Sequence, residues 1–191
     1  MAFDGTGDYL INGSINSTFY QFGTGDFTVG FWLYPTTVSV VQYLIDFRDP
    51  IIPSGAAVYL FLSASAKLAI YVGPNAVITA STTSISANTW THIALVKNGT
   101  GSNNYKLYIN GNADATTGTY TNILTFGFLT VAANSAQRNT AATDKLNGYL
   151  QDLRITKGYA RYGTGTGANA GQMVFNGTNT LALPTAAFPT L

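Results

Sequence analysis

Short runs of apolar residues recur from one end of the chain to the other, and turn-forming residues separate them. The runs are rich in Val, Ile, Tyr, Phe and Thr, whereas the intervals contain Gly, Asn, Asp and Pro. This pattern is typical of β-strands joined by turns, and signals for helices are nearly absent. The clearest predicted strands cover residues 27–34, 40–47, 58–62, 68–72, 77–83, 90–96, 105–110 and 146–156.

Alternation within these runs indicates how the strands pack. In residues 90–96, one face carries Trp90, His92, Ala94 and Val96, and the other carries Thr91, Ile93 and Leu95. Both faces are largely apolar, which favours a strand covered on one side and partly covered on the other. With about a dozen strands and no fixed-period repeat, we expect an all-β fold, a two-sheet antiparallel jelly-roll sandwich rather than a barrel or a propeller.

The length of 191 residues suits one large β domain. We interpret residues 1–162 as the body of this domain and residues 163–191 as a loop and C-terminal extension. The first part of the extension is rich in Gly and Thr, and the run Met173-Val174-Phe175 between turn residues predicts a short strand. Because the last residues are strongly apolar, we expect the extension to pack on the domain or on a partner.

Charge is the unusual feature of the composition. Only 9% of the residues are charged, against about 25% in an ordinary soluble domain. A neutral surface loses little solvation energy when a partner covers it, which favours assembly or self-association. The net charge is +1 and the basic residues are scattered, so binding to nucleic acid is not expected.

The sequence also bounds the chemistry and the location of the protein. It contains no Cys, which excludes disulfides and thiolate metal sites. No apolar run reaches the roughly 18 residues that a membrane span requires. If Met1 is the natural start, no cleaved secretion signal is present, because the first residues lack a basic segment followed by an apolar one.

Four stretches in order carry a family resemblance: residues 3–10, 26–35, 90–99 with 107–111, and 148–162. Together they resemble the laminin-G-like jelly-roll domains of the concanavalin A-like lectin/glucanase superfamily. More narrowly, they are similar to the versions found in bacteriophage structural proteins. The resemblance extends over about 160 residues, nearly the whole chain, and the segment before Pro184 departs from the family pattern.

The resemblance raises the question of catalysis, because the superfamily includes glucan hydrolases. Glycoside hydrolysis generally uses a pair of carboxylates about 5–10 Å apart. All eight acidic residues are Asp, and no Asp-x-Asp triplet would place two of them on one face of a strand. The single His, His92, lies within a predicted strand, which favours a packed histidine over a catalytic one. We therefore expect that the protein is not an enzyme.

The resemblance implies a virion structural protein of a bacteriophage, such as a capsid decoration, head-fibre or tail-associated subunit. Such a protein would be located in the virion and would act by assembling with other virion proteins or with itself. The alternative is a lectin-like module that binds host-surface glycans, for which Tyr20, Tyr43, Tyr59, Tyr120, Tyr159 and Tyr162 are candidate stacking residues. For either function, the predicted binding residues are Tyr159, Arg161, Tyr162 and Phe175.

Two further expectations concern single residues. The family resemblance implies a structural calcium ion near Asp152, with Asp4 and Asp26 in position to help and with backbone carbonyls as the other ligands. The alternative role for these carboxylates is to cap turns. The large aromatic residues Phe31, Trp32 and Trp90 are expected to pack in the core.

Overall fold

The computed structural model describes residues 1–13, 18–49, 57–72, 76–124, 128–135 and 144–161. The predicted extension over residues 163–191, including the expected strand at 173–175, lies outside the described residues. So do Tyr162 and Phe175, two of the predicted binding residues. In the described part of the chain, no helix is long and apolar enough to span a membrane.

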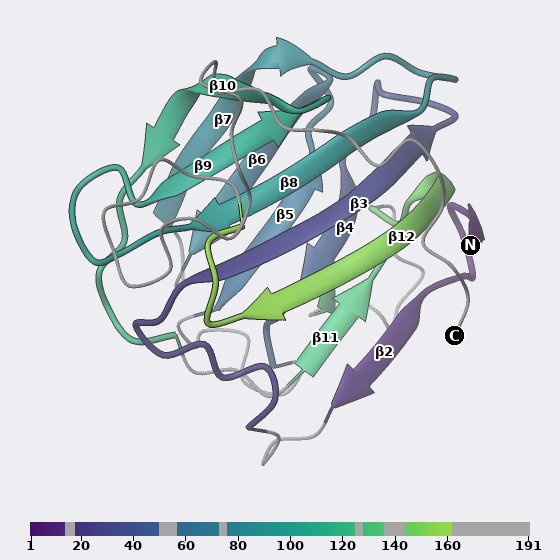
Figure 1. The fold of residues 1–191 in the computed structure, drawn as a ribbon. Coiled ribbons are helices and arrows are strands. Elements are labelled where there is room, and N and C mark those ends of the chain that lie inside the picture. Colours follow the sequence, from purple (N-terminus) through teal and green to yellow (C-terminus); the bar gives the residue numbers. More distant parts are fainter. Residues whose placement is uncertain (14–17, 50–56, 73–75, 125–127, 136–143, 162–191) are drawn as a thin grey trace.

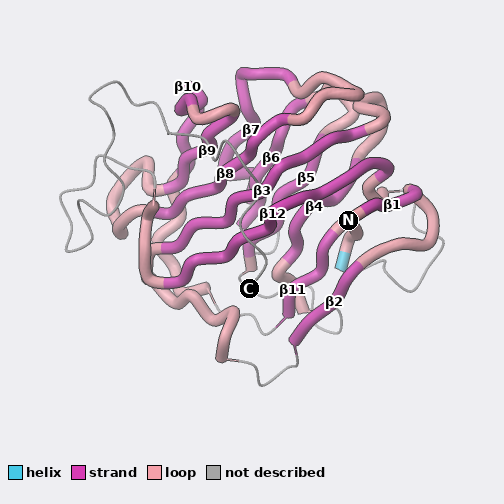
Figure 2. The backbone as a smooth tube through the Cα atoms, turned by 45° about the vertical axis from the view of Figure 1, so that its right-hand side comes forward, coloured by secondary structure: helices cyan, strands magenta, loops and turns pink. Residues whose placement is uncertain are grey.

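Two six-stranded sheets face each other, and the neighbouring strands in each sheet are antiparallel (Figure 1, Figure 2). Sheet A contains, in order, β1 (Ala2–Asp4), β12 (Asn147–Lys157), β3 (Phe27–Pro35), β8 (Thr91–Lys97), β9 (Tyr105–Ile109) and β10 (Asn112–Gly118). Sheet B contains, in order, β2 (Leu10–Gly13), β11 (Phe128–Val131), β4 (Gln42–Asp46), β5 (Val58–Leu62), β6 (Lys67–Val72) and β7 (Ala76–Ser84). The predicted all-β sandwich of two antiparallel sheets is confirmed.

The core lies between the sheets, and the alternation of β3 shows how it is built. Successive strand residues point to opposite faces of a sheet, so Phe27, Val29, Phe31 and Leu33 all point inward. Each of these four side chains is at most 1% exposed. Their neighbours Thr28, Gly30, Trp32 and Tyr34 therefore belong to the outer face of sheet A.

The prediction that all three large aromatics pack in the core is thus right only for Phe31. Trp32, the next residue along β3, points to the outer face because the side-chain period of a strand is two. Trp90 precedes β8 and is 41% exposed. Both tryptophans therefore belong to a surface, and this surface contains the candidate site.

Asp114 joins the two sheets along the edge formed by β10 and β7. Its carboxylate accepts hydrogen bonds from the backbone N–H groups of Thr82 and Thr83 on β7, each at 3.0 Å. It also accepts bonds from the N–H and the hydroxyl of Thr116 on its own strand. These bonds keep the pKa of the buried Asp114 well below its usual range, although burial alone would raise it.

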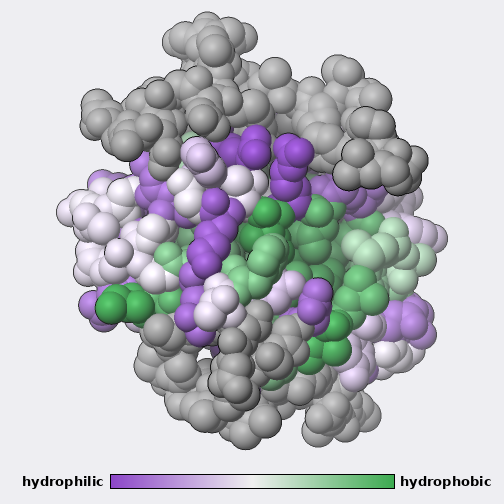
Figure 3. All heavy atoms as spheres, turned by 60° about the horizontal axis from the view of Figure 1, so that its bottom comes forward, coloured by the Kyte–Doolittle hydropathy of each residue, from purple (hydrophilic) through white to green (hydrophobic). Residues whose placement is uncertain are grey.

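The opposite edge of sheet B is more apolar. Its last strand, β2, exposes Leu10 and Ile11 by 46% and 43%. Apolar side chains gather on the face that comes forward when the bottom of Figure 1 is turned toward the reader (Figure 3). An exposed strand edge invites pairing with another chain, and self-association therefore remains a prediction.

Candidate functional site

The outer face of sheet A carries a row of three aromatic side chains across three neighbouring strands. Tyr149 on β12 is in register with Tyr34 on β3. Leu33 pairs with Thr91 on β8, which places Trp90 beside Tyr34 on the other side. Residues in register on adjacent strands lie about 5 Å apart, so the three rings are neighbours although Trp90 and Tyr149 are far apart in the sequence.

The three rings form a compact group rather than a line. The ring centroids of Tyr34 and Trp90 are 5.4 Å apart, those of Tyr34 and Tyr149 are 5.7 Å apart, and those of Trp90 and Tyr149 are 6.4 Å apart. Their planes are inclined to one another by 50° to 74°. Trp90 and Tyr149 are 41% and 45% exposed, and Tyr34 is half-buried between them.

A row of polar residues runs beside the aromatic row, at the end of the sheet. It contains Asn147, Thr36 and Asn88. The Thr36 N–H donates to the Asn147 carbonyl at 2.9 Å, and the Thr36 hydroxyl lies 2.7 Å from Oδ1 of the same residue. The Asn88 N–H donates to the carbonyl of Pro35 at 2.8 Å. Asn88 has a φ of 55°, a left-handed conformation that Asn adopts more readily than most residues.

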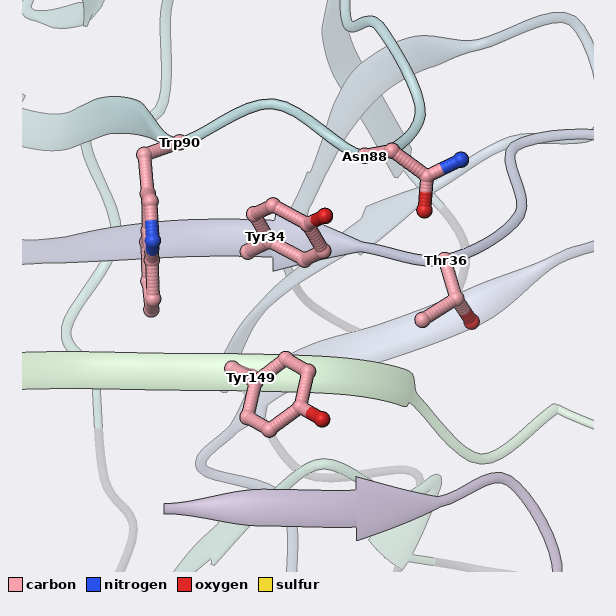
Figure 4. A pocket seen from close by; sticks show the side chains of 5 residues that line it. All are labelled: Tyr34, Thr36, Asn88, Trp90 and Tyr149. Carbon is pink, nitrogen blue, oxygen red and sulfur yellow. The ribbon is translucent and has the colours of Figure 1, made fainter.

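Together the two rows line an open pocket of about 370 Å³, formed by Tyr34, Thr36, Asn88, Trp90 and Tyr149. In Figure 4 the Trp90 ring is seen edge-on, so it stands as a wall on one side of the two tyrosines. The hydroxyl groups of Tyr34 and Tyr149 both point toward the end of the sheet that carries Thr36. The pocket therefore combines aromatic surfaces with neutral hydrogen-bonding groups.

A third row lies next to the aromatic group on the same outer face, farther from the end of the sheet. It contains Gln151, Trp32 and His92, which are in register on β12, β3 and β8. The rings of Trp32 and His92 meet edge to face at 5.3 Å. His92 is buried, and burial lowers the pKa of its imidazole. The prediction of a packed strand histidine is consistent with this position.

The polar groups that line the pocket are all neutral. None of its five lining residues is Asp, Glu, Lys, Arg, Ser, Cys or His. Across the described residues, no group of three or more His, Cys, Asp or Glu could hold a metal ion. The arrangement suits binding of a neutral, partly apolar ligand.

The three aspartates expected around a calcium ion do not converge. Asp4 pairs with Asn147 at the start of β12, whereas Asp26 precedes Phe27, which pairs with Lys157 at the end of that strand. These ends are about 30 Å apart at the usual rise of a strand. Asp4 accepts hydrogen bonds from the N–H groups of Thr6, Gly7 and Asp8, and Asp26 accepts one from Gly99.

Asp152 lies between these ends, at a bulge of β12. Its φ is 54°, and its Oδ2 atom is buried without a hydrogen-bond partner among the described residues. Backbone carbonyls and water would have to supply nearly all of the six to eight oxygens that calcium takes beside Asp152 alone. The residues thus do not fit a calcium site built from all three aspartates. Asp4 instead holds a local turn, and Asp26 binds the backbone of Gly99, which is distant in the sequence.

The described residues of the predicted binding set lie at the other end of sheet A. The Thr28 hydroxyl donates to the carbonyl of Tyr159 at 3.0 Å and accepts from the N–H of Arg161 at 2.9 Å. Thr28 is six residues along β3 from Tyr34, which is about 20 Å. Tyr159 and Arg161 therefore do not belong to the aromatic pocket.

The tyrosines predicted for glycan stacking are also not the ones the pocket uses. Tyr20 and Tyr59 are only 5% and 6% exposed. Tyr34 and Tyr149 are not among the tyrosines predicted to stack on glycans. The alternation of residues 27–34 does place Tyr34 on the face of the strand opposite Phe31. That signal identifies the face of the strand, but it does not reveal which faces remain open to solvent.

A second aromatic group lies on the outer face of sheet B, and its rings pack against one another. It comprises Tyr43, Tyr59, Phe61 and Tyr71, whose neighbouring centroids are 5.0 to 6.3 Å apart. Arg48 lies 3.9 Å from the centroid of the Tyr59 ring and forms a 2.6 Å ion pair with the buried Asp46. Burial raises the pKa of Tyr59 to about 12. We therefore regard the pocket on sheet A as the candidate site.

Solved structures with the same fold include domains from animals and bacteria. Domains LG4-5 of the mouse laminin α1 chain are 16% identical, with a TM-score of 0.60, over 81% of this chain and 40% of that one. The Ruminococcus gnavus IT-sialidase CBM40, bound to α2,3-sialyllactose, is 12% identical, with a TM-score of 0.55, over 69% of this chain and 76% of that one. Domain 4 of the Geobacillus stearothermophilus arabinanase AbnA, in complex with arabinotriose, is 17% identical, with a TM-score of 0.57, over 80% of this chain and 84% of that one.

At these identities the likeness shows a shared fold. No curated protein matches the chain. A family model described as the concanavalin A-like lectin/glucanases superfamily matches residues 4–160. This match covers most of the sequence, and the chain therefore belongs to the concanavalin A-like lectin/glucanase superfamily.

Proposed function

We propose that this domain is a non-catalytic carbohydrate-binding module and that the pocket on sheet A is its binding site. The observation that carries the proposal is the solvent-exposed group formed by Tyr34, Trp90 and Tyr149, with polar Thr36 and Asn88 at its rim. A sugar ring has an apolar C–H face and a polar edge of hydroxyl groups. Aromatic faces accommodate the first, and neutral donors and acceptors accommodate the second.

Two of the structurally similar domains support this proposal. One is described as a carbohydrate-binding module bound to sialyllactose and the other as a domain in complex with arabinotriose. Their identities are low, so the support concerns the scaffold and not the residues. None of the similar structures described above supports the bacteriophage structural role expected from the family resemblance.

The test is a glycan array with the full chain, followed by calorimetry of the best ligand with wild type and Trp90→Ala. Stacking of a ring on an aromatic side chain is worth about 1–3 kcal/mol when the ring is a nucleic-acid base. A loss of similar size would weaken binding by about ten- to a hundredfold. Trp90 is exposed at the surface, so we expect the variant to remain folded.

Tyr159→Ala is the matched control. Tyr159 is 38% exposed, comparable to Trp90, and it also lies at sheet A, but about 20 Å from the pocket. We expect this variant to bind glycan as the wild type does. Binding that depends on Tyr159 and not on Trp90 would move the site to the opposite end of the sheet. Failure of every glycan to bind would contradict the proposed function.

A further inference from the structure

The charge distribution around the pocket suggests which glycans it can select. The aromatic row and the polar row contain no cationic side chain. The charged residue in register with them is Asp4, which pairs with Asn147 across β1 and β12. Asp4 and Asn147 both point outward, because the next pair along the two strands, Phe3 and Gly148, points inward. Hydrogen bonds from Gly7 and Thr6 keep the pKa of Asp4 well below its usual range, so its charge persists.

Among the residues that the structure describes, the cations nearest the pocket are engaged elsewhere. Lys145 lies two residues before the start of β12, but it is buried, its ammonium group donates to the Thr6 carbonyl at 2.7 Å and it lies over the ring of Tyr9. Arg154 is in register with Gly30, four residues along β3 from Tyr34, which is about 13 Å. Arg154 also has an interaction of its own within the protein. Among the described residues, an anionic sugar in the pocket would therefore find the Asp4 carboxylate beside the polar row and no cation free to pair with it.

The shape of the aromatic group suggests how much of a glycan it contacts. A flat platform for a long chain would need rings in one plane and in one line. Here the three centroid distances are similar, 5.4 to 6.4 Å, and the planes are steeply inclined. Trp90 forms a wall, and Thr36 and Asn88 face it across the two tyrosines (Figure 4). Because the three rings touch one another, they offer a small, uneven aromatic patch with room for one sugar ring rather than a platform for a long chain.

From these two observations we infer that the pocket selects a single uncharged sugar residue, presented at the end of a glycan, and discriminates against sialylated, sulfated and uronic-acid sugars. The inference rests on the proposed function and adds the ligand class to it. It also predicts a ligand specificity different from that of the similar sialidase module, which is bound to a sialylated sugar. The physical basis is that an anionic sugar would lose part of its hydration near the Asp4 carboxylate, with no cation among the described residues to offset that loss.

The experiment compares matched pairs of glycans on the full chain. Each pair consists of a neutral oligosaccharide and the same oligosaccharide ending in sialic acid or sulfate, and each is titrated into wild type and Trp90→Ala. We expect the neutral member to bind at least about tenfold more tightly, which is about 1.4 kcal/mol. The corresponding free monosaccharide should keep its affinity within about tenfold of the oligosaccharide. Affinity should change by less than about twofold between low and high salt, because no ion pair is screened.

The outcomes separate the two claims. Binding that requires Trp90 but favours the acidic member, or weakens steeply with salt, overturns the inference and leaves the proposed function in place. Binding that requires Trp90 but grows much more than tenfold with chain length overturns the single-residue geometry. The absence of any binding that requires Trp90 overturns the proposed function and this inference with it.

Discussion

Gly148 lies at the point where β12 passes closest to β3, directly between Asn147 of the polar row and Tyr149 of the aromatic row. A Cβ atom built on it would lie 2.2 Å from the Tyr34 carbonyl oxygen and 2.9 Å from the Cα atom of Pro35. Both neighbours are backbone atoms of β3, which also pairs with β8 on its other side. The clash cannot be relieved by rotating a side chain, so one strand must move.

We therefore predict that Gly148→Ala destabilises the fold strongly. Overpacking a tight site costs about 1–3 kcal/mol, and the φ of 151° adds about 1–3 kcal/mol of backbone strain for any residue with a Cβ atom. The sum is about 2–6 kcal/mol. In a protein of this size, each kcal/mol lowers the melting temperature by about 2–4 °C, so the expected decrease is roughly 4–24 °C.

Gly158→Ala separates the clash from the backbone strain. Gly158, just after β12, has a φ of +86°, and a Cβ atom there would meet nothing within 4 Å. This variant should therefore lose only the strain part, about 1–2 kcal/mol. Thermal unfolding followed by circular dichroism measures both. If the melting temperature of Gly148→Ala is no lower than that of Gly158→Ala, then β12 and β3 do not approach each other as closely as described.

Three further predictions concern stability and metal binding. Burial lowers the pKa of His92, the only His in the chain, so the unfolded chain takes up a proton first as the pH falls below about 6.5. Melting temperature should therefore decrease from pH 7 to pH 5, and a His92→Gln variant with an undiminished slope would contradict this. Asp114→Asn should cost about 2–4 kcal/mol in urea unfolding at pH 7, because the carboxylate accepts charge-assisted bonds from the edge strands of both sheets, β7 and β10. An unchanged urea midpoint in this variant would show that β7 and β10 do not depend on the carboxylate to stay together. Since the pKa of Asp114 is lowered, its contribution to the free energy of unfolding is present above about pH 4 and decreases as the pH falls further. A chelator should leave the melting temperature unchanged, because Asp4, Asp26 and Asp152 do not converge, and a clear decrease would instead demonstrate a bound metal ion.

The long strands could be predicted from the sequence because each carries its own alternation. The expected strands at 27–34, 58–62 and 105–110 agree with β3, β5 and β9 to within one residue at either end. Within β3 the same alternation separates Phe31, which faces the core, from Tyr34, which does not. The shorter strands β1 and β11, of three and four residues, were not predicted. They carry too few residues for a pattern and become strands only because β12 and β4 offer them hydrogen bonds.

The candidate site depended on tertiary structure. Tyr34 and Tyr149 lie on separate strands and Trp90 directly precedes a third, so their meeting is decided by the register of β12 with β3 and of β3 with β8. The hydrophobic pattern fixes which face of each strand is buried, but for strands far apart in the chain it does not say which strands are neighbours or which residues lie opposite each other. The same holds for the aspartates: their sequence positions suggested one calcium site, but Asp4 and Asp26 lie at opposite ends of a long strand. The sequence by itself determined that the chain forms two apolar-faced sheets without a catalytic carboxylate pair on one strand face, because these properties are local. Only the tertiary structure decided which face stays open and which residues share it, because both depend on what the rest of the chain covers.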